Sequence, residues 1–194
     1  MDVPTQASSE EFNPDSPGVA DPTALEAAIA GVEKEIKELQ FPGFTAADAL
    51  ALGLILVEYG TSRNLPIAID ITRGGQTLFH VALEGATGDN DLWAAAKSRT
   101  AMRYQAPSLL VGLRGRRNGG RMESNAWWDH SRFAAHGGSF PVYVKNAGAV
   151  ATVTVSGLHQ QADHDVVVEA MRQHLAAAKN RVSRRSRSTA KSGE

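Results

Sequence analysis

The segment 139–156 constrains the fold of this chain more than any other part of the sequence. Apolar side chains alternate with other residues along both of its halves, and Asn146-Ala147-Gly148 separates them. A period of two is typical of β-strands, and a turn containing glycine between two such runs predicts a hairpin. Gly137-Gly138 precedes the first strand, and Ser156-Gly157 ends the second. Because the strands of a hairpin are antiparallel, we expect both glycine pairs at the same edge of the sheet.

A second hairpin is predicted over residues 66–83. Its two halves also alternate with period two, and Arg73-Gly74-Gly75 supplies the turn between them. Asp70 and His80 fall on the more polar face of this hairpin, where they should lie close together. The two side chains could line a pocket, or they could form a half-exposed ion pair that binds nothing.

Five further segments carry apolar residues at helical spacing. These segments are residues 23–39, 45–63, 91–105, 109–117 and 158–178. The helix over 45–63 is apolar around most of its circumference, which favours contacts with both the sheet and a second subunit. Hairpins and helices in this order predict an α+β fold with a small antiparallel sheet, rather than a parallel α/β fold.

The sequence predicts three regions. Residues 1–22 contain four prolines among small and polar residues, so we expect a disordered N-terminal segment. Residues 23–178 form the folded domain. Residues 179–194 are basic and rich in serine, and they predict a disordered tail that is either solvated or in contact with an acidic partner or nucleic acid.

The composition argues against several classes of protein. The chain of 194 residues has a formal net charge of −1, which makes general binding of nucleic acid an unfavoured function. It contains no cysteine, so neither disulfides nor thiolate–metal sites can form. The N-terminus lacks the basic and apolar regions of a secretory signal, and no apolar run is long enough to span a membrane. We therefore expect a cytoplasmic protein without a membrane segment.

Two groups of residues could bind a ligand. The helix over 91–105 carries Lys97, Arg99 and Arg103, which form either an anion clamp or a solvated basic surface. His136 directly precedes Gly137-Gly138, where a backbone without side chains would let a ligand approach closely. The spacing of the histidines matches no structural metal site. A single axial histidine is nevertheless sufficient to hold haem in an apolar pocket.

Several motifs, taken together, resemble the haem-degrading domain family of HbpS, GlcG and PduO C-terminal-like proteins. They are Gly137-Gly138-Ser139-Phe140-Pro141, the hairpin through Gly148, Thr154-Val155-Ser156-Gly157-Leu158, Asp163-His164, Leu78-Phe79-His80, Gly85, and Asn90-Asp91-Leu92-Trp93 with Lys97. The resemblance covers about residues 44–175 and is closer to the uncharacterised cytoplasmic branch of the family. It implies a profilin-like or PAS-like α+β domain, with a five-stranded antiparallel sheet packed with helices.

The resemblance also implies a function. Some members of the family bind haem or corrinoids, and some degrade haem. We therefore expect a homo-oligomer built from dimers that binds haem, or another small anionic ligand, near Gly137-Gly138, with Ser156 and Gly157 beside it. His136 or His80 would be the axial ligand of the haem iron. Lys97 and Arg103 would pair with the haem propionates.

Two other functions fit the sequence. The first is a non-enzymatic oligomeric interaction or scaffold protein, which would bind partners through its tails or through Trp127-Trp128. The second is an enzyme that acts on a small carboxylated metabolite, an interpretation that depends only on the basic residues near the glycine loop.

Overall fold

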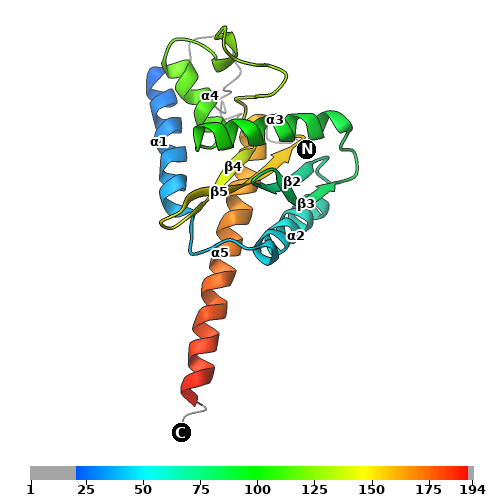
Figure 1. Ribbon diagram of the computed structural model, residues 1–194, viewed down its shortest axis with the longest axis vertical. Helices are drawn as coiled ribbons and strands as arrows, with labels where there is room; N and C mark the ends of the chain where they lie inside the picture. The colour runs from blue at the N-terminus through cyan, green and yellow to red at the C-terminus, as the bar shows by residue number, and fades with distance from the viewer. Residues whose placement is uncertain (1–20, 192–194) are drawn as a thin grey trace, which may run out of the picture.

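The computed structural model describes the backbone of residues 21–191 and the side chains of residues 21–179. Five α-helices, one short 3-10 helix and five strands occur in this part of the chain (Figure 1). In chain order they are α1 (Pro22–Glu38), β1 (Gln40–Phe41), α2 (Ala46–Ser62), β2 (Ala68–Arg73), β3 (Gln76–Ala82), α3 (Gly88–Tyr104), α4 (Ser108–Arg117), η1 (Met122–Ser124), β4 (Ser139–Val144), β5 (Gly148–Ser156) and α5 (Gln160–Lys191). Both predicted hairpins and all five predicted helices are present.

The first two helices begin at residues that satisfy their free backbone N–H groups. The Asp21 side chain accepts a hydrogen bond from the Thr23 N–H at 3.0 Å, and Pro22 occupies the first turn, where its missing N–H costs nothing. At the start of α2, Thr45 and Asp48 form a capping box. Asp48 N–H donates to Thr45 Oγ1 at 3.2 Å, and Thr45 N–H donates to Asp48 Oδ2 at 2.8 Å.

The five strands form one sheet in the order β1-β4-β5-β2-β3. Three of the four pairings are antiparallel, as the sequence predicts, but β1 runs parallel to β4, with Gln40 opposite Tyr143. The sheet is therefore mixed, and the prediction of an antiparallel sheet is wrong at this edge. A strand of two residues has no periodicity to detect, and a long connection through other elements can return β4 in either direction.

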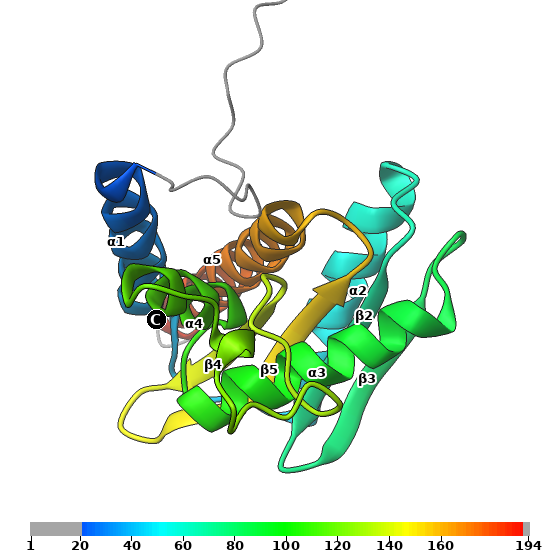
Figure 2. The ribbon, with the colours of Figure 1, turned by 90° about the horizontal axis from the view of Figure 1, so that it is seen from above.

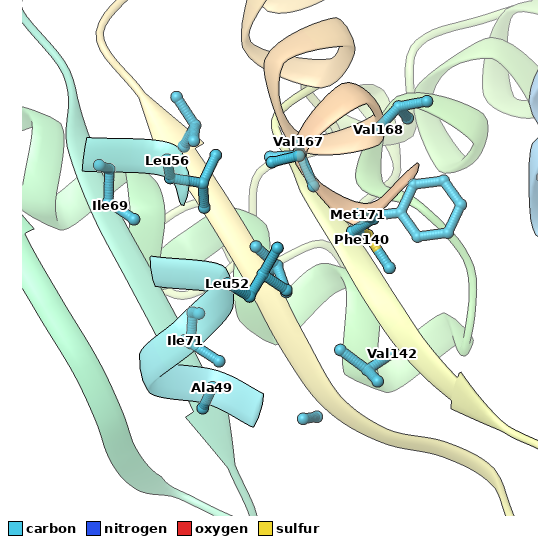
Figure 3. Packing of buried hydrophobic residues seen from close by; sticks show 14 of the residues in the cluster. Ala49, Leu52, Leu56, Ile69, Ile71, Phe140, Val142, Val167, Val168 and Met171 are labelled. Carbon is cyan, nitrogen blue, oxygen red and sulfur yellow. The ribbon is translucent and has the colours of Figure 1, made fainter. Parts of the chain in front are cut away.

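The helices cover both faces of the sheet (Figure 2). Helices α2 and α5 lie on one face and α3 lies on the other. On the first face, Leu52 and Leu56 of α2 and Met171 of α5 pack against the sheet residues Ile69 and Phe140 (Figure 3). All five side chains are buried, so this layer is the main hydrophobic core. A second apolar cluster joins α1 to α4.

The sheet face that contacts α3 is buried but polar. Ser98 of α3 and Thr152 of β5 share a hydrogen bond of 2.7 Å between their hydroxyl oxygens, and Ser139 and Thr154 share one of 2.9 Å. All four residues are buried. Because a buried hydroxyl needs a hydrogen-bond partner, the first pair fixes how α3 sits on β5, and the second joins β4 to β5. This face of the sheet leads directly to the glycine pairs at its edge.

Helix α5 continues beyond the end that the sequence predicts. Its backbone is helical through Lys191, whereas the predicted last helix ends near residue 178. Residues 179–191 contain neither proline nor glycine, and their alanine, lysine and arginine residues are good helix formers, so nothing in the chain stops the helix at 178. The predicted N-terminal segment lies outside the described residues, apart from its last two positions.

Candidate functional site

The two glycine pairs meet at one edge of the sheet, as predicted. Gly138 directly precedes β4 and Gly157 directly follows β5. The Val155 N–H donates a hydrogen bond of 2.8 Å to the Gly138 carbonyl, which links the two turns. Gln160, at the start of α5, closes the arrangement because its Oε1 accepts from the Gly137 N–H at 3.2 Å.

Close packing of the chain itself explains why glycine stands at these positions. Gly138 has a φ of +123° and Gly157 a φ of +152°, which side chains with a Cβ rarely adopt. A Cβ at Gly138 would collide with the Val155 carbonyl oxygen, and one at Gly137 would collide with the Gln160 carbonyl oxygen. The atoms nearest to these two glycines are therefore backbone oxygens of the protein, and the side chains of Asp163 and Lys97 also lie close to Gly138.

A buried ion pair lies behind the Gly138 turn. Lys97 Nζ is 2.7 Å from Asp163 Oδ2, and neither side chain is more than 6% exposed. Asp163 Oδ1 also accepts a hydrogen bond of 3.0 Å from the Leu158 N–H. Burial raises the pKa of Asp163 above its ordinary value, and the Lys97 ammonium with the Leu158 and Gly157 N–H groups offsets only part of that effect. The pair joins α3 to the first turn of α5, and Asp163 in turn holds the β5–α5 turn through Leu158.

Two adjoining hollows open beside this edge. The first, here the apolar hollow, has a volume of about 370 Å³, and its lining includes Leu92, Trp93, Ala96, Arg99, His130 and Phe133. The second, here the polar hollow, has a volume of about 300 Å³, and its lining includes Asn90, Lys97, Ser156, Gly157, His159 and Gln160. Asp89, Trp93 and His136 line both, so they form the boundary between the two hollows. Volumes of this size suit a small organic ligand.

The imidazole of His136 is the central chemical group of this boundary. Its ring meets the indole of Trp93 edge to face, with 5.3 Å between the ring centroids. His136 Nε2 lies 3.7 Å from Glu123 Oε1, and the imidazole is 31% exposed. A neighbouring carboxylate at this distance helps to orient the imidazole. The indole N–H of Trp93 is held in turn by Asp89 Oδ2 at 3.1 Å.

The three basic residues of α3 have three different surroundings. Lys97 is buried in its pair with Asp163, so the predicted solvated surface is wrong for this residue, although it lines the polar hollow. Arg103 lies over the rings of Phe133 and Trp127, at 4.8 and 5.4 Å from their centroids, and it does not line either hollow. Arg99 does line the apolar hollow.

His80 lies apart from this site. Its Nδ1 is 3.5 Å from Asp70 Oδ2, as expected for two residues that are opposite each other on β2 and β3, and its Nε2 is 3.5 Å from Asp91 Oδ1. The His80 side chain is 41% exposed and lines neither hollow. Of the two alternatives that the sequence left open for Asp70 and His80, this arrangement matches the half-exposed pair and not the pocket lining.

Several residues of the hollows were not identified from the sequence. They are Asp89, Glu123, His130, His159, Gln160 and Asp163. Asp89 and Trp93 are four residues apart on α3, a spacing at which side chains meet, but the predicted helix began at residue 91 and left Asp89 outside it. Nothing in the sequence indicated that Glu123 would lie near His136, because the segment that carries it has no periodic pattern.

Membrane-spanning helices and clusters of metal-binding side chains are both absent from the described residues. None of the helices among them is long and apolar enough to cross a membrane. Within the same part of the chain, no cluster of three or more histidine, aspartate or glutamate side chains could hold a metal ion.

The sequence of this chain is similar to a family of proteins across most of the folded region. Residues 44–172 match the family described as haem degrading protein HbpS-like. A UPF0303 protein of Streptomyces coelicolor is 49% identical over 147 residues, which cover 76% of this chain and 93% of that protein. A UPF0303 protein of Paraburkholderia phytofirmans is 42% identical over 137 residues, covering 71% of this chain and 83% of that protein. The chain therefore belongs to the HbpS-like haem-degrading family, and its similar relatives are UPF0303 proteins.

Solved structures share the fold. The Ybr137w protein superposes with a TM-score of 0.70 at 27% identity, covering 80% of this chain and 92% of that one. The haem complex of PduOC has a TM-score of 0.58 at 15% identity, covering 66% and 93% of the two chains. HbpS has a TM-score of 0.52 at 21% identity, with coverage of 69% and 89%. The α+β fold class and the family resemblance predicted from the sequence are thus confirmed.

Proposed function

We propose that this protein binds haem, or another flat ligand with an acid group, in the apolar hollow, with His136 as the ligand of the haem iron. The observation that carries the proposal is the contact between His136 and Trp93 at the boundary of the two hollows. Membership of the HbpS-like family supports it, as does the haem complex of PduOC, a protein of the same fold. One protein imidazole is sufficient to hold haem iron.

The residues of the apolar hollow fit haem. Leu92, Ala96 and Phe133 supply apolar walls for a porphyrin face, and Trp93 offers a ring for stacking. His130 adds a second imidazole to the lining. When bound, haem would supply a redox-active iron, while the protein side chains hold and orient it.

The glycine turns have a separate part in the proposal. Ser156 and Gly157 line the polar hollow, which adjoins the apolar one at His136. Polar substituents of a ligand can therefore extend towards the β5–α5 turn. Gly137 and Gly138 contribute indirectly, because their close packing fixes the position of the neighbouring His136. His80 has no part in this site because it lines neither hollow.

Titration of the purified protein with haemin tests the proposal. The wild-type protein should shift the Soret band with saturable, one-to-one binding. His136→Ala should change the Soret position and weaken binding by about tenfold or more, because an axial ligand is lost. His80→Ala is the matched control and should behave like the wild type. Identical spectra for His136→Ala and the wild type would exclude His136 as the iron ligand.

A second candidate, an oligomeric interaction or scaffold protein, is favoured by the surface of α2. Leu50 and Leu54, four residues apart, are 52% and 55% exposed on this helix. Large apolar side chains that share one helix face favour a protein contact, and we propose a second copy of this chain as the partner. Sedimentation velocity tests it: Leu50→Asp with Leu54→Asp should lower the mass of the particle, while Thr61→Asp on the same helix should not. An unchanged mass would rule out this face.

A further inference from the structure

We infer that Arg99 binds a carboxylate of the ligand and thereby selects ligands with an apolar body and an acid group at one end. This inference depends on the proposed function, since it names the chemical class that the apolar hollow accepts. Haem, with its propionates, and smaller aromatic acids both belong to that class. The inference is carried by the distribution of charge around the hollow and by the bonds that each charged side chain already makes.

Arg99 is the basic residue of α3 that remains available to a ligand. Lys97 is engaged by Asp163 at 2.7 Å, and Arg103, which lies over the rings of Phe133 and Trp127, lines neither hollow. Arg99 Nε donates to the Arg132 carbonyl at 2.6 Å, which anchors the guanidinium against the loop before β4. Its two terminal nitrogens have no partner among the described residues. A guanidinium held by Nε presents these nitrogens as a fork, and a carboxylate binds such a fork with two hydrogen bonds.

The negative charges of the hollow are separated from Arg99. Asp89 and Arg99 both line it and are ten residues apart on α3, which corresponds to about 15 Å of helix. Asp89 accepts a hydrogen bond from the Trp93 indole at 3.1 Å. Glu123 accepts one from the Ala135 N–H at 3.1 Å and lies 3.7 Å from His136 Nε2. Both carboxylates therefore belong to the part of the hollow that contains Trp93 and His136.

This arrangement orients the ligand. A carboxylate placed beside Asp89 or Glu123 would be repelled, whereas one placed beside Arg99 would be attracted. Trp93 and Ala96, which precede Arg99 on α3, supply the surface for the apolar body. His130 lines the same hollow, and its imidazole can also donate a hydrogen bond to an acid group there. A bound haem would place its iron at His136 and its propionates at Arg99.

The experiment compares haemin with its dimethyl ester, in which both propionates are blocked. For the wild type and Arg99→Gln, the dissociation constant of each is measured from the Soret shift. Arg99→Gln should weaken haemin binding by about tenfold, a moderate effect because Arg99 is exposed, and should leave binding of the ester unchanged. Arg99→Lys keeps the positive charge but lacks the guanidinium fork, so its affinity for haemin should lie between those of the wild type and Arg99→Gln. Arg63→Gln, at the C-terminal cap of α2, is the control.

The two ligands separate recognition of the acid from loosening of the loop. If Arg99→Gln acts only by losing the bond to Arg132 and disordering the hollow, it will weaken the binding of haemin and of the ester equally. That result would overturn the inference. A third arm uses 2-naphthoate, followed by tryptophan fluorescence. Should haemin fail to bind the wild type while 2-naphthoate binds through Arg99, the haem proposal falls and the role of Arg99 stands. If neither acid binds, or if both bind equally well to Arg99→Gln, the role of Arg99 is refuted.

Discussion

Replacing Lys97 by methionine should destabilise the protein more than most substitutions do. Met fills a similar volume but removes the ammonium that lies 2.7 Å from Asp163, whose side chain is fully buried. Removal of one partner of a buried ion pair typically costs about 3–5 kcal/mol, because the other charge is left uncompensated. Total stabilities of domains are about 5–15 kcal/mol, so we expect Lys97→Met to lose a large share of the free energy of unfolding.

A double-mutant cycle with Asp163→Asn measures the interaction energy between Lys97 and Asp163 apart from the contacts that each makes with other residues. Asn at 163 can still accept from the Leu158 N–H through its amide oxygen, but it leaves the Lys97 ammonium with only the Val155 carbonyl at 3.5 Å. Each single variant therefore contains one unpaired charge, and the double variant contains none. We expect the double variant to be less destabilised than the sum of the singles by about 2 kcal/mol or more.

Urea unfolding followed by circular dichroism measures these differences. The pH dependence gives a further check. In Lys97→Met the pKa of Asp163 should rise further, and folding then favours the protonated carboxyl. The stability of this variant should therefore be higher at about pH 5 than at about pH 8, since a raised carboxyl pKa removes stability as the pH increases. A cost below about 1 kcal/mol for both single variants, or strict additivity in the cycle, would refute this account of the pair.

Three other predictions follow from single contacts. Gly138→Ala should lower the free energy of unfolding by more than about 2 kcal/mol, because φ at this position is +123° and the added Cβ would meet the Val155 carbonyl. Gly74→Ala is the control: its Cβ would have open space, so it should cost less in the same urea experiment. Burial raises the pKa of Tyr143 to about 12. The contribution of Tyr143 to stability is therefore complete below about pH 10 and is lost as the pH rises towards 12. If the absorbance change of phenolate formation near pH 12 persisted in Tyr143→Phe, this assignment would be contradicted. Thr45→Ala removes the α2 capping box and should lower the thermal midpoint through a loss of about 1 kcal/mol, whereas no change would show that the cap is dispensable.

The architecture was predictable because its elements follow simple periodic patterns. The alternation around Gly148 gave the β4–β5 hairpin, and Thr45 marked the start of α2. β1 was not predictable, because its two residues are defined only by their pairing with β4. The prediction of an antiparallel sheet came from the two hairpins, because a short turn can only join antiparallel strands. A strand such as β1, which is joined to its partner by a long connection, can pair in either direction.

The candidate site was predictable only in part. The glycine pairs and His136 lie at the predicted edge, since the order of strand and turn determines that position. The burial of Lys97 could not be foreseen from its charge. It is buried because α3 has small residues around it, including Ala94, Ala96 and Ser98, which let the helix approach a sheet face made of hydroxyl side chains. The alternation of β5 revealed that face, but threonine on a strand is more often exposed than buried.

The central claim is that His136 holds haem in the apolar hollow. The most direct measurement is the absorption spectrum and haem content of the protein purified from cells grown with added haem. We expect a Soret band in the wild type and in His80→Ala. In His136→Ala the band should be lost, or it should be shifted with a lower haem content. A wild-type protein that carries no haem and takes none up from haemin, or a His136→Ala variant with the same spectrum and haem content as the wild type, would contradict it.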